Sequence, residues 1–369
     1  MNTDLKPIGL CLSGGGSRAI AFHLGCLRAM NKKGLLDKIS VISAVSGGSV
    51  IGAMYAFSHD SFDEFDARVV DLLKKGLMVA IARQLFFSPI LFKCLATVLT
   101  AGITAGPCRL LGRPPMRRWA SRTDGFERAV DRRLFRGLRI NSERRAGMDI
   151  VINACELRTG SAFRFGSKES GCWRYGRLTN NDVSVAHAVA ASAAYPIFLP
   201  ALDRTLSFTK EGAISDHRVI LADGGLYDNL GTTCVEPDRD ERYSTNVFNP
   251  PYIISCNAGY GLFADNIVPY GFFSRVARSF ETEHRKVQDG AMKRLFEFSE
   301  NRRIKGFVLS YLGQQDKSLP SPPPDLVRRE QVDYPTDFRA MTDEKIGSCS
   351  KRGEQLMTLM IDTYCPELR

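Results

Sequence analysis

The strongest constraint on the fold is a pair of strand–turn–helix units close to the N-terminus. An apolar run at 8–12 predicts a buried strand, and three glycines end it before a helical pattern over 18–33. A second apolar run at 41–45 meets a serine–glycine–glycine turn and then a helical pattern over about 49–57. Strands that alternate with helices in this way favour an α/β fold with parallel strands in one sheet.

The same alternation resumes near residue 149 and continues along the rest of the chain. Further strands are predicted at 149–154, 219–222, 252–256 and 306–311. Further helices are predicted at 66–84, 183–194 and 270–298, and from about residue 337 onward. We therefore expect residues 1–369 to form a single α/β domain with a mainly parallel central sheet.

Residues 60–146 differ from the rest and are interpreted as a helical insertion within that domain. Residues 85–103 are apolar, with Lys93 as their only charge. Residues 109–145 then hold twelve arginines, no lysine and four acidic residues, a formal charge of +8 against +10 for the whole chain.

Composition excludes several other classes of protein. The chain is 44% hydrophobic and 24% charged, as in ordinary globular proteins and unlike disordered or collagenous ones. Its ten cysteines include no C-x-x-C pair, so we expect buried, reduced thiols, no metal site and a cytoplasmic location. Residues 1–7 lack the apolar core of a signal peptide, and no apolar run reaches the roughly 20 residues of a membrane span.

Ser46 is the first candidate for chemistry. It lies at a sharp strand-to-helix junction and is followed by Gly47 and Gly48, as a nucleophile elbow requires. The residues two positions to either side must be small for such a turn to close, and here they are Ala44 and Gly48. The alternative is a turn that only joins a strand to a helix.

The glycine triplet is the second candidate. Main-chain N–H groups of Gly14, Gly15 and Gly16 can face a common point and bind an anion, either a phosphate or the oxyanion of an acyl-transfer reaction. Arg18 follows, and it either braces the loop, adds positive potential or forms a structural ion pair. The triplet also fits G-x-G-x-x-A, so a dinucleotide-binding protein is a competing interpretation.

Asp223 is the third candidate, because it ends a predicted strand and is followed by Gly224 and Gly225. A carboxylate at that edge of an α/β sheet can take a proton from a serine and return it to a leaving group. The alternative is an ordinary Asp-Gly turn. Asp228 is a rival acid that we interpret as structural, because it lies past the turn.

Together these segments resemble the patatin-like phospholipases. Residues 12–18 are similar to that family's glycine-rich oxyanion loop, 45–48 to its nucleophile elbow and 223–225 to its D-G-[GA] box. Residues 191–196 resemble the stretch between elbow and box, and residues 352–354 add a weaker likeness. The likeness covers about 1–57 and 149–260, not 60–146. The chain departs from the family's pattern at Ala44 and Ala19. At both positions alanine replaces glycine, so one small residue replaces another.

The resemblance implies a patatin-like three-layer fold and a serine esterase with a Ser–Asp dyad and no cofactor. In the implied mechanism Asp223 deprotonates Ser46, Gly14, Gly15 and Gly16 hold the oxyanion, and Arg18, Gly48, Gly224 and Gly225 support the site. The spacing of the five histidines leaves a Ser–His–Asp triad open, with His217 and His187 as its nearest candidates. Ordinary structural or surface histidines are favoured.

A lipid substrate gives the insertion a role. Apolar side chains and arginines within 78–118 predict peripheral contact with an anionic membrane. The alternative is a buried helical cap whose arginines are solvated or paired. A non-catalytic lipid-binding module is the rival to an enzyme of lipid degradation. Nucleic acid is not expected as a partner, because aromatic residues are sparse and no recognition motif is present.

Overall fold

The computed structural model describes residues 6–113, 116–196, 198–261 and 268–368, without the side chains of residues 101, 102, 273, 277 and 280. Its strands form one ten-stranded sheet in the order β10-β9-β1-β2-β3-β4-β5-β6-β7-β8, and β8 also pairs with β3. Residues 1–5, part of the segment used to assess a signal peptide, lie outside the described residues. So do residues 114–115 of the segment 78–118.

The sheet is mixed, with a parallel half and an antiparallel half. The parallel strands are β10 (Gly306–Tyr311), β9 (Tyr252–Asn257), β1 (Ile8–Leu12), β2 (Ile39–Ala44) and β3 (Asp149–Glu156). The antiparallel strands are β4 (Ser161–Gly166), β5 (Ser170–Cys172), β6 (Gly176–Leu178), β7 (Leu202–Lys210) and β8 (Ala213–Asp223). The expected α/β fold is confirmed, and the parallel strands form one half of its mixed sheet.

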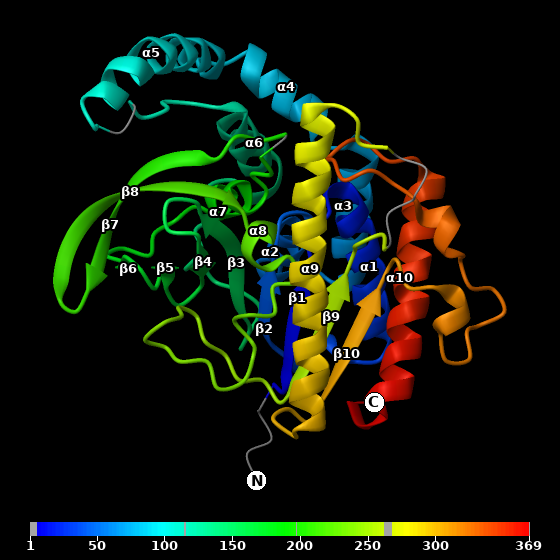
Figure 1. Ribbon diagram of the computed structural model, residues 1–369. Coiled ribbons are helices and arrows are strands. Elements are labelled where there is room, and N and C mark those ends of the chain that lie inside the picture. Colours follow the sequence, from blue (N-terminus) through cyan, green and yellow to red (C-terminus); the bar gives the residue numbers. More distant parts are fainter. Residues whose placement is uncertain (1–5, 114–115, 197, 262–267, 369) are drawn as a thin grey trace.

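Helices cover both faces of the parallel strands, which is why those strands are apolar along their whole length. The larger core lies beneath α1 (Gly16–Lys32), α2 (Gly47–Ala56), α3 (Phe62–Lys75) and α10 (Asp343–Tyr364). A smaller core on the opposite face joins Cys11, Val41 and Ile253 to Leu295 of α9 (Phe272–Glu300). Figure 1 shows α9 running across the sheet and α10 lying beside α1. The result is three layers.

The remaining helices belong to the middle of the chain. They are α4 (Met78–Phe86), α5 (Ile90–Leu110), α6 (Arg122–Val130), α7 (Val185–Ser192) and α8 (Gly225–Asp228), with a π-helix at Asp131–Phe135. Short 3₁₀ helices occupy Leu36–Lys38, Asp316–Ser318, Arg329–Val332 and Pro366–Leu368.

Two predicted elements differ from the observed ones. The single helix over 66–84 is wrong, because α3 ends before Gly76, whose φ is +60°, and α4 begins at Met78. A side chain at Gly76 would also lie 2.3 Å from the backbone nitrogen of Ala340. The strand over 219–222 is too short, because β8 extends back to Ala213 as half of a long hairpin with β7.

The helices α4 and α5 expose most of their apolar side chains. Phe87, Phe92 and Leu110 are 86%, 77% and 90% exposed. These exposures contradict the alternative of a buried cap for α4 and α5. Figure 1 shows α5 standing away from the sheet, at the end of the molecule toward which β9 and β10 point.

The described helices were also compared with the needs of a membrane span. No single one is long and apolar enough to cross a bilayer. Met78–Phe86 and Ile90–Thr100, bent by 75° at their junction, together have the length and composition.

Some arginines of the stretch that follows α5 are bound by main-chain carbonyls of the protein itself. Arg145 donates to the carbonyls of Tyr55 and Asp60, and Arg133 donates to that of Gly76. These two arginines, near the C-terminal end of the stretch, are therefore paired within the protein, as the alternative to membrane contact predicts.

The ten cysteines are all free, as expected of reduced thiols. Eight are buried, whereas Cys94 and Cys108 are half-buried because they lie on the exposed helix α5. The expectation that Cys94 is buried is wrong.

Candidate active site

Ser46 occupies the junction between β2 and α2 in a strained backbone conformation. Its φ is +50° and its ψ is −117°, values that a residue with a side chain rarely adopts. A Cβ atom on Gly48 would lie 2.3 Å from the carbonyl oxygen of Leu12 and 2.6 Å from that of Ser13. Only glycine therefore fits at position 48, and the elbow packs directly on the end of β1.

The alanine that departs from the elbow pattern has a local compensation. A Cβ atom on Gly52, one turn into α2, would lie 3.2 Å from the Cβ of Ala44. Glycine at position 52 thus leaves room for the extra methyl group at position 44. The substitution of alanine for glycine in the elbow is accommodated without moving Ser46.

The register of the sheet brings Asp223 to the level of Ser46. Ala44 of β2 pairs with Ile152 of β3, and Asp223 at the end of β8 pairs with Ala154 on the same edge of β3, because β4 occupies the opposite edge. The ends of β2 and β8 therefore meet along that edge, and Ser46, two residues past Ala44, comes next to Asp223 with no strand between them. Both side chains are buried, with 7% and 5% exposure.

The Ser46 side chain lies beside the carboxylate of Asp223 and favours its charged form. The N–H of Gly225 donates to Oδ1 of the same carboxylate at 2.7 Å. Burial raises the pKa of Asp223 to about 7, and the Gly225 N–H and the Ser46 side chain oppose that rise because they stabilise the charged form. A carboxyl group that titrates near neutral pH can both accept and return a proton.

The glycine triplet lies beside Ser46. A Cβ atom on Gly14 would be 3.4 Å from the Cβ of Ser46 and 2.5 Å from Oδ1 of Asn229. The N–H of Gly14 donates to the carbonyl of Asn229 at 3.2 Å, so it is already engaged. The oxyanion hypothesis is therefore narrowed to the N–H groups of Gly15 and Gly16. Both belong to the positive N-terminal end of α1.

Arg18 braces the loop. Its Nε donates to the carbonyl of Ala258 at 3.0 Å, Nη1 to that of Tyr334 at 2.7 Å and Nη2 to Oγ1 of Thr336 at 3.1 Å. These contacts tie the first turn of α1 to two distant segments. Among the interpretations given above, bracing is the one that the contacts favour.

The glycines after Asp223 allow close packing. A Cβ atom on Gly224 would lie 2.2 Å from the carbonyl oxygen of Asn153. One on Gly225 would lie 2.8 Å from Oδ1 of Asp223. Asp228 accepts from the N–H groups of Gly231 and Thr233 at 3.0 and 2.7 Å, which agrees with its structural interpretation.

Four of the five histidines have contacts or positions unrelated to the dyad. His23 bonds to the carbonyl of Ser13, His187 to Glu127 and His217 to Ser215, while His59 is exposed.

His284 lies closer to the site than its sequence position suggests. It is half-buried on α9, and its Cε1 is 2.9 Å from where a Cβ of Gly225 would lie. Nothing in the surrounding sequence indicated this approach, because α9 is far along the chain from the elbow.

The end of α7 also contacts both candidate residues. The hydroxyl of Ser192 accepts a hydrogen bond from the N–H of Ser46 at 2.8 Å. The N–H of Asp223 donates to the carbonyl of Ala194 at 3.0 Å. The sequence offered a family likeness for this stretch and no role for its side chains.

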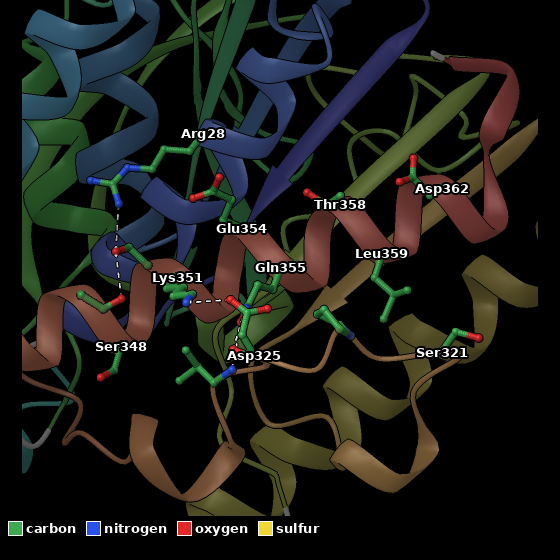
Figure 2. A pocket seen from close by; sticks show the side chains of 14 residues that line it. Arg28, Ser321, Asp325, Ser348, Lys351, Glu354, Gln355, Thr358, Leu359 and Asp362 are labelled. Carbon is green, nitrogen blue, oxygen red and sulfur yellow. Dashed lines mark hydrogen bonds and ion pairs between the residues drawn. The ribbon is translucent and has the colours of Figure 1, made fainter.

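A large hollow of about 890 Å³ lies elsewhere, between α10 and residues 321–327. Figure 2 shows its lining, in which Lys351 pairs with Asp325 at 2.8 Å and Arg28 donates to Ser350. None of the candidate residues lines it. It therefore contributes nothing to the dyad.

Among the described residues, no three His, Cys, Asp or Glu side chains are grouped to hold a metal ion.

The sequence was compared with protein-family models and with curated proteins. The model described as patatin-like phospholipase matches residues 10–233, more than half of the chain. Two proteins named lysophospholipase NTE1 match a short stretch. The one from Pyricularia oryzae is 45% identical over 51 residues, and the one from Coccidioides immitis is 46% identical over 55. These stretches are 14% and 15% of this chain but only 3% of each of those proteins.

The fold was compared with solved structures. Human GIVD cytosolic phospholipase A2 aligns with a TM-score of 0.53 and 12% identity, over 97% of this chain and 60% of that one. The same human protein in complex with methyl gamma-linolenyl fluorophosphonate and terbium chloride aligns with a TM-score of 0.51 and 13% identity, over 97% and 58%. At these identities the likeness shows a shared fold.

Proposed function

Because the chain belongs to the patatin-like phospholipase family, we propose that it hydrolyses fatty-acyl esters of lipids, as a phospholipase A or lysophospholipase does. Ser46 is the nucleophile and Asp223 the general base and acid. The observation that carries the proposal is the strained, buried Ser46 beside the buried carboxylate of Asp223, whose pKa is raised to about 7. No histidine stands between the two groups.

The reaction proceeds in two steps. Asp223 takes the proton from Ser46 as its oxygen attacks the ester carbonyl, and the N–H groups of Gly15 and Gly16 stabilise the oxyanion. One such donor is worth about 3 kcal/mol of barrier. Asp223 returns the proton to the departing alcohol or lysophospholipid. It then activates a water molecule that releases the fatty acid from Ser46.

The exposed helices supply a way to reach the lipid. We propose that residues 60–146 are an insertion in a single domain, and that 78–118 contacts the membrane peripherally. Support comes from the apolar exposure of α4 and α5 and from charge, because residues 72–123 contain nine lysines and arginines but no acidic residue. Each cation near an anionic surface contributes about 1 kcal/mol. The free thiols support a cytoplasmic location for this peripheral contact.

The two alternatives have less support. A non-catalytic lipid-binding module does not require a strained serine beside a buried carboxylate. A dinucleotide at the glycine triplet is disfavoured, because Asn229 packs on Gly14 and the backbone of Asp337 packs on Gly16.

The test is hydrolysis of phospholipids and lysophospholipids in vesicles, with the products identified by mass. Purified protein is expected to release fatty acid, and Ser46→Ala and Asp223→Asn are each expected to abolish release. His284→Ala is the matched control, because His284 approaches the same turn without joining the dyad. Release that persists in Ser46→Ala, or that disappears in His284→Ala while the fold is retained, would overturn the mechanism.

A further inference from the structure

Ser192 contacts Ser46, the proposed nucleophile, through the backbone N–H of Ser46. Its hydroxyl oxygen accepts the N–H of Ser46 at 2.8 Å, and its side chain is completely buried. Ser46 is held at a φ of +50°, and its backbone N–H does not belong to the hydrogen bonding of α2. The Ser192 hydroxyl therefore fixes the peptide group from which the nucleophilic oxygen projects.

The same short segment also fixes the general base. The N–H of Gly224 donates to the carbonyl of Ser192 at 3.3 Å, and the N–H of Asp223 donates to the carbonyl of Ala194 at 3.0 Å. One end of α7 thus bonds the backbone of Ser46 on one side and of the Asp223 turn on the other. The distance between the two reacting groups is set in part through this bridge.

Only one of these bridging bonds depends on a side chain. The bonds to Asp223 and Gly224 use main-chain carbonyls, which remain in any variant that folds. The bond to Ser46 uses the Ser192 hydroxyl. Removal of that hydroxyl leaves the N–H of Ser46 buried without this acceptor and frees a strained backbone to relax.

We propose that Ser192 is a positioning residue that holds Ser46 in line with Asp223, an inference that rests on the hydrolase function proposed above. It acts through the backbone of Ser46 and does not touch the substrate carbonyl. Misplacement of a reacting group by about 1 Å can cost 100-fold in rate. Loss of this bond is therefore expected to lower kcat and leave KM nearly unchanged.

Ser49 provides a matched control. Its hydroxyl is also buried and also bonds the Ser46 backbone, donating to the carbonyl oxygen at 2.6 Å. The N–H of Ser49 donates to the same carbonyl at 2.9 Å, so that contact survives when the hydroxyl is removed. Ser49→Ala is expected to keep most of the activity.

The experiment measures kcat, KM and the pH profile of lysophospholipid hydrolysis for wild type, Ser192→Ala and Ser49→Ala, with the melting temperature of each. Ser192→Ala is expected to lose roughly 10- to 100-fold in kcat. The acid limb of its profile is expected to move to higher pH, because a displaced Ser46 side chain no longer lowers the pKa of Asp223. A residue with a merely structural role would not move that limb.

The outcomes separate the two proposals. Inactive wild-type protein overturns the proposed function. Active wild-type protein together with a Ser192→Ala variant of unchanged kcat and pH profile overturns the role of Ser192. If Ser192→Ala does not fold, Ser192→Cys replaces it, because the thiol is similar in size and a weak acceptor. Unchanged kcat and pH profile in that variant overturn the role, and a reduced kcat with a shifted acid limb supports it.

Discussion

The carboxyl group of Asp223 lies in a buried position that disfavours its charged form. The group is buried at the end of β8, and its pKa is raised to about 7. The pKa of a lone buried carboxylate would be raised further, but the N–H of Gly225, which donates to Asp223, and the nearby Ser46 side chain both stabilise the charged form. These two groups leave Asp223 able to gain and lose a proton near neutral pH.

The pH dependence of activity follows from that position. Asp223 must be ionised to accept the proton of Ser46, so kcat/KM is expected to rise about tenfold per pH unit below pH 7 and to level off above it. The measurement is kcat/KM for a soluble short-chain ester between pH 5 and pH 9. A flat profile across this range would contradict the role of Asp223.

The same pKa shift predicts a stability effect in Asp223→Asn. The carboxyl is protonated in both folded and unfolded chains at low pH, so it costs nothing there. As pH rises from about 4 to 7 the unfolded chain ionises first, and the native state pays a growing penalty that reaches about 4 kcal/mol above pH 7. The variant is thus expected to melt above wild type at pH 8, with the gap closing at pH 4. Equal melting temperatures at both pH values would refute the shift.

Residues near the dyad differ in how far the sequence could predict them. Ser46, Asp223 and the glycines stand in local patterns whose geometry is nearly self-contained, so the motifs brought out these positions. Ser192 and His284 reach the site from α7 and α9 through tertiary packing. No local spacing encodes such an approach. The N–H of Gly14 was counted among the oxyanion donors because no local pattern indicates its bond to the carbonyl of Asn229, which lies far along the sequence.

Among the helices, α4 and α5 are unusual because they leave most of their apolar side chains exposed. A helix that is apolar on most sides is normally buried in a core or in a bilayer. Here α4 is anchored by Ile81 and by contact of Leu85 with α6 near Gly125, while the phenylalanines at its end face outward. Deletion of 78–118 would remove that anchor, so point substitutions give a cleaner test.

The expected result is loss of membrane binding when outward apolar side chains are removed. Phe86→Ser, Phe87→Ser and Phe92→Ser in one variant are expected to weaken flotation with phosphatidylserine vesicles at least tenfold, because each ring buries roughly 1.5 kcal/mol or more of transfer free energy. Binding of wild type is expected to be weaker to neutral vesicles.

Ile214→Ser combined with Tyr364→Ser is the control for the membrane test, because those exposed side chains lie on the β7–β8 hairpin and at the end of α10. The control is expected to bind as wild type does. Equal binding by wild type and the triple phenylalanine variant would exclude the proposed contact.

Element boundaries show where sequence periodicity stopped being informative. The strand at 306–311 was predicted at its observed limits, because a short apolar run of this kind is typical of a parallel strand. The break at Gly76 was missed, because α3 and α4 share one helical period and the residue that forces the break, Ala340, is far along the chain. The hairpin before Asp223 was missed because its outer half is exposed and polar.

For the whole molecule, the candidate site is an outcome of sheet topology. Parallel pairing of β1, β2 and β3 sets the glycine loop beside the elbow, and antiparallel entry of β8 next to β3 delivers Asp223 to the same edge. In Figure 1, α4 and α5 lie at the end of the molecule toward which the parallel strands β9 and β10 point. A membrane bound there would face the edge of the sheet that carries the dyad.

The most direct measurement is the position of a covalent adduct after reaction with an alkyl fluorophosphonate, located by mass spectrometry of peptides. The account predicts one adduct, on Ser46, formed at nearly the wild-type rate in His284→Ala and far more slowly in Asp223→Asn. An adduct on a different residue, or labelling of Ser46 that needs His284 and is indifferent to Asp223, would contradict it.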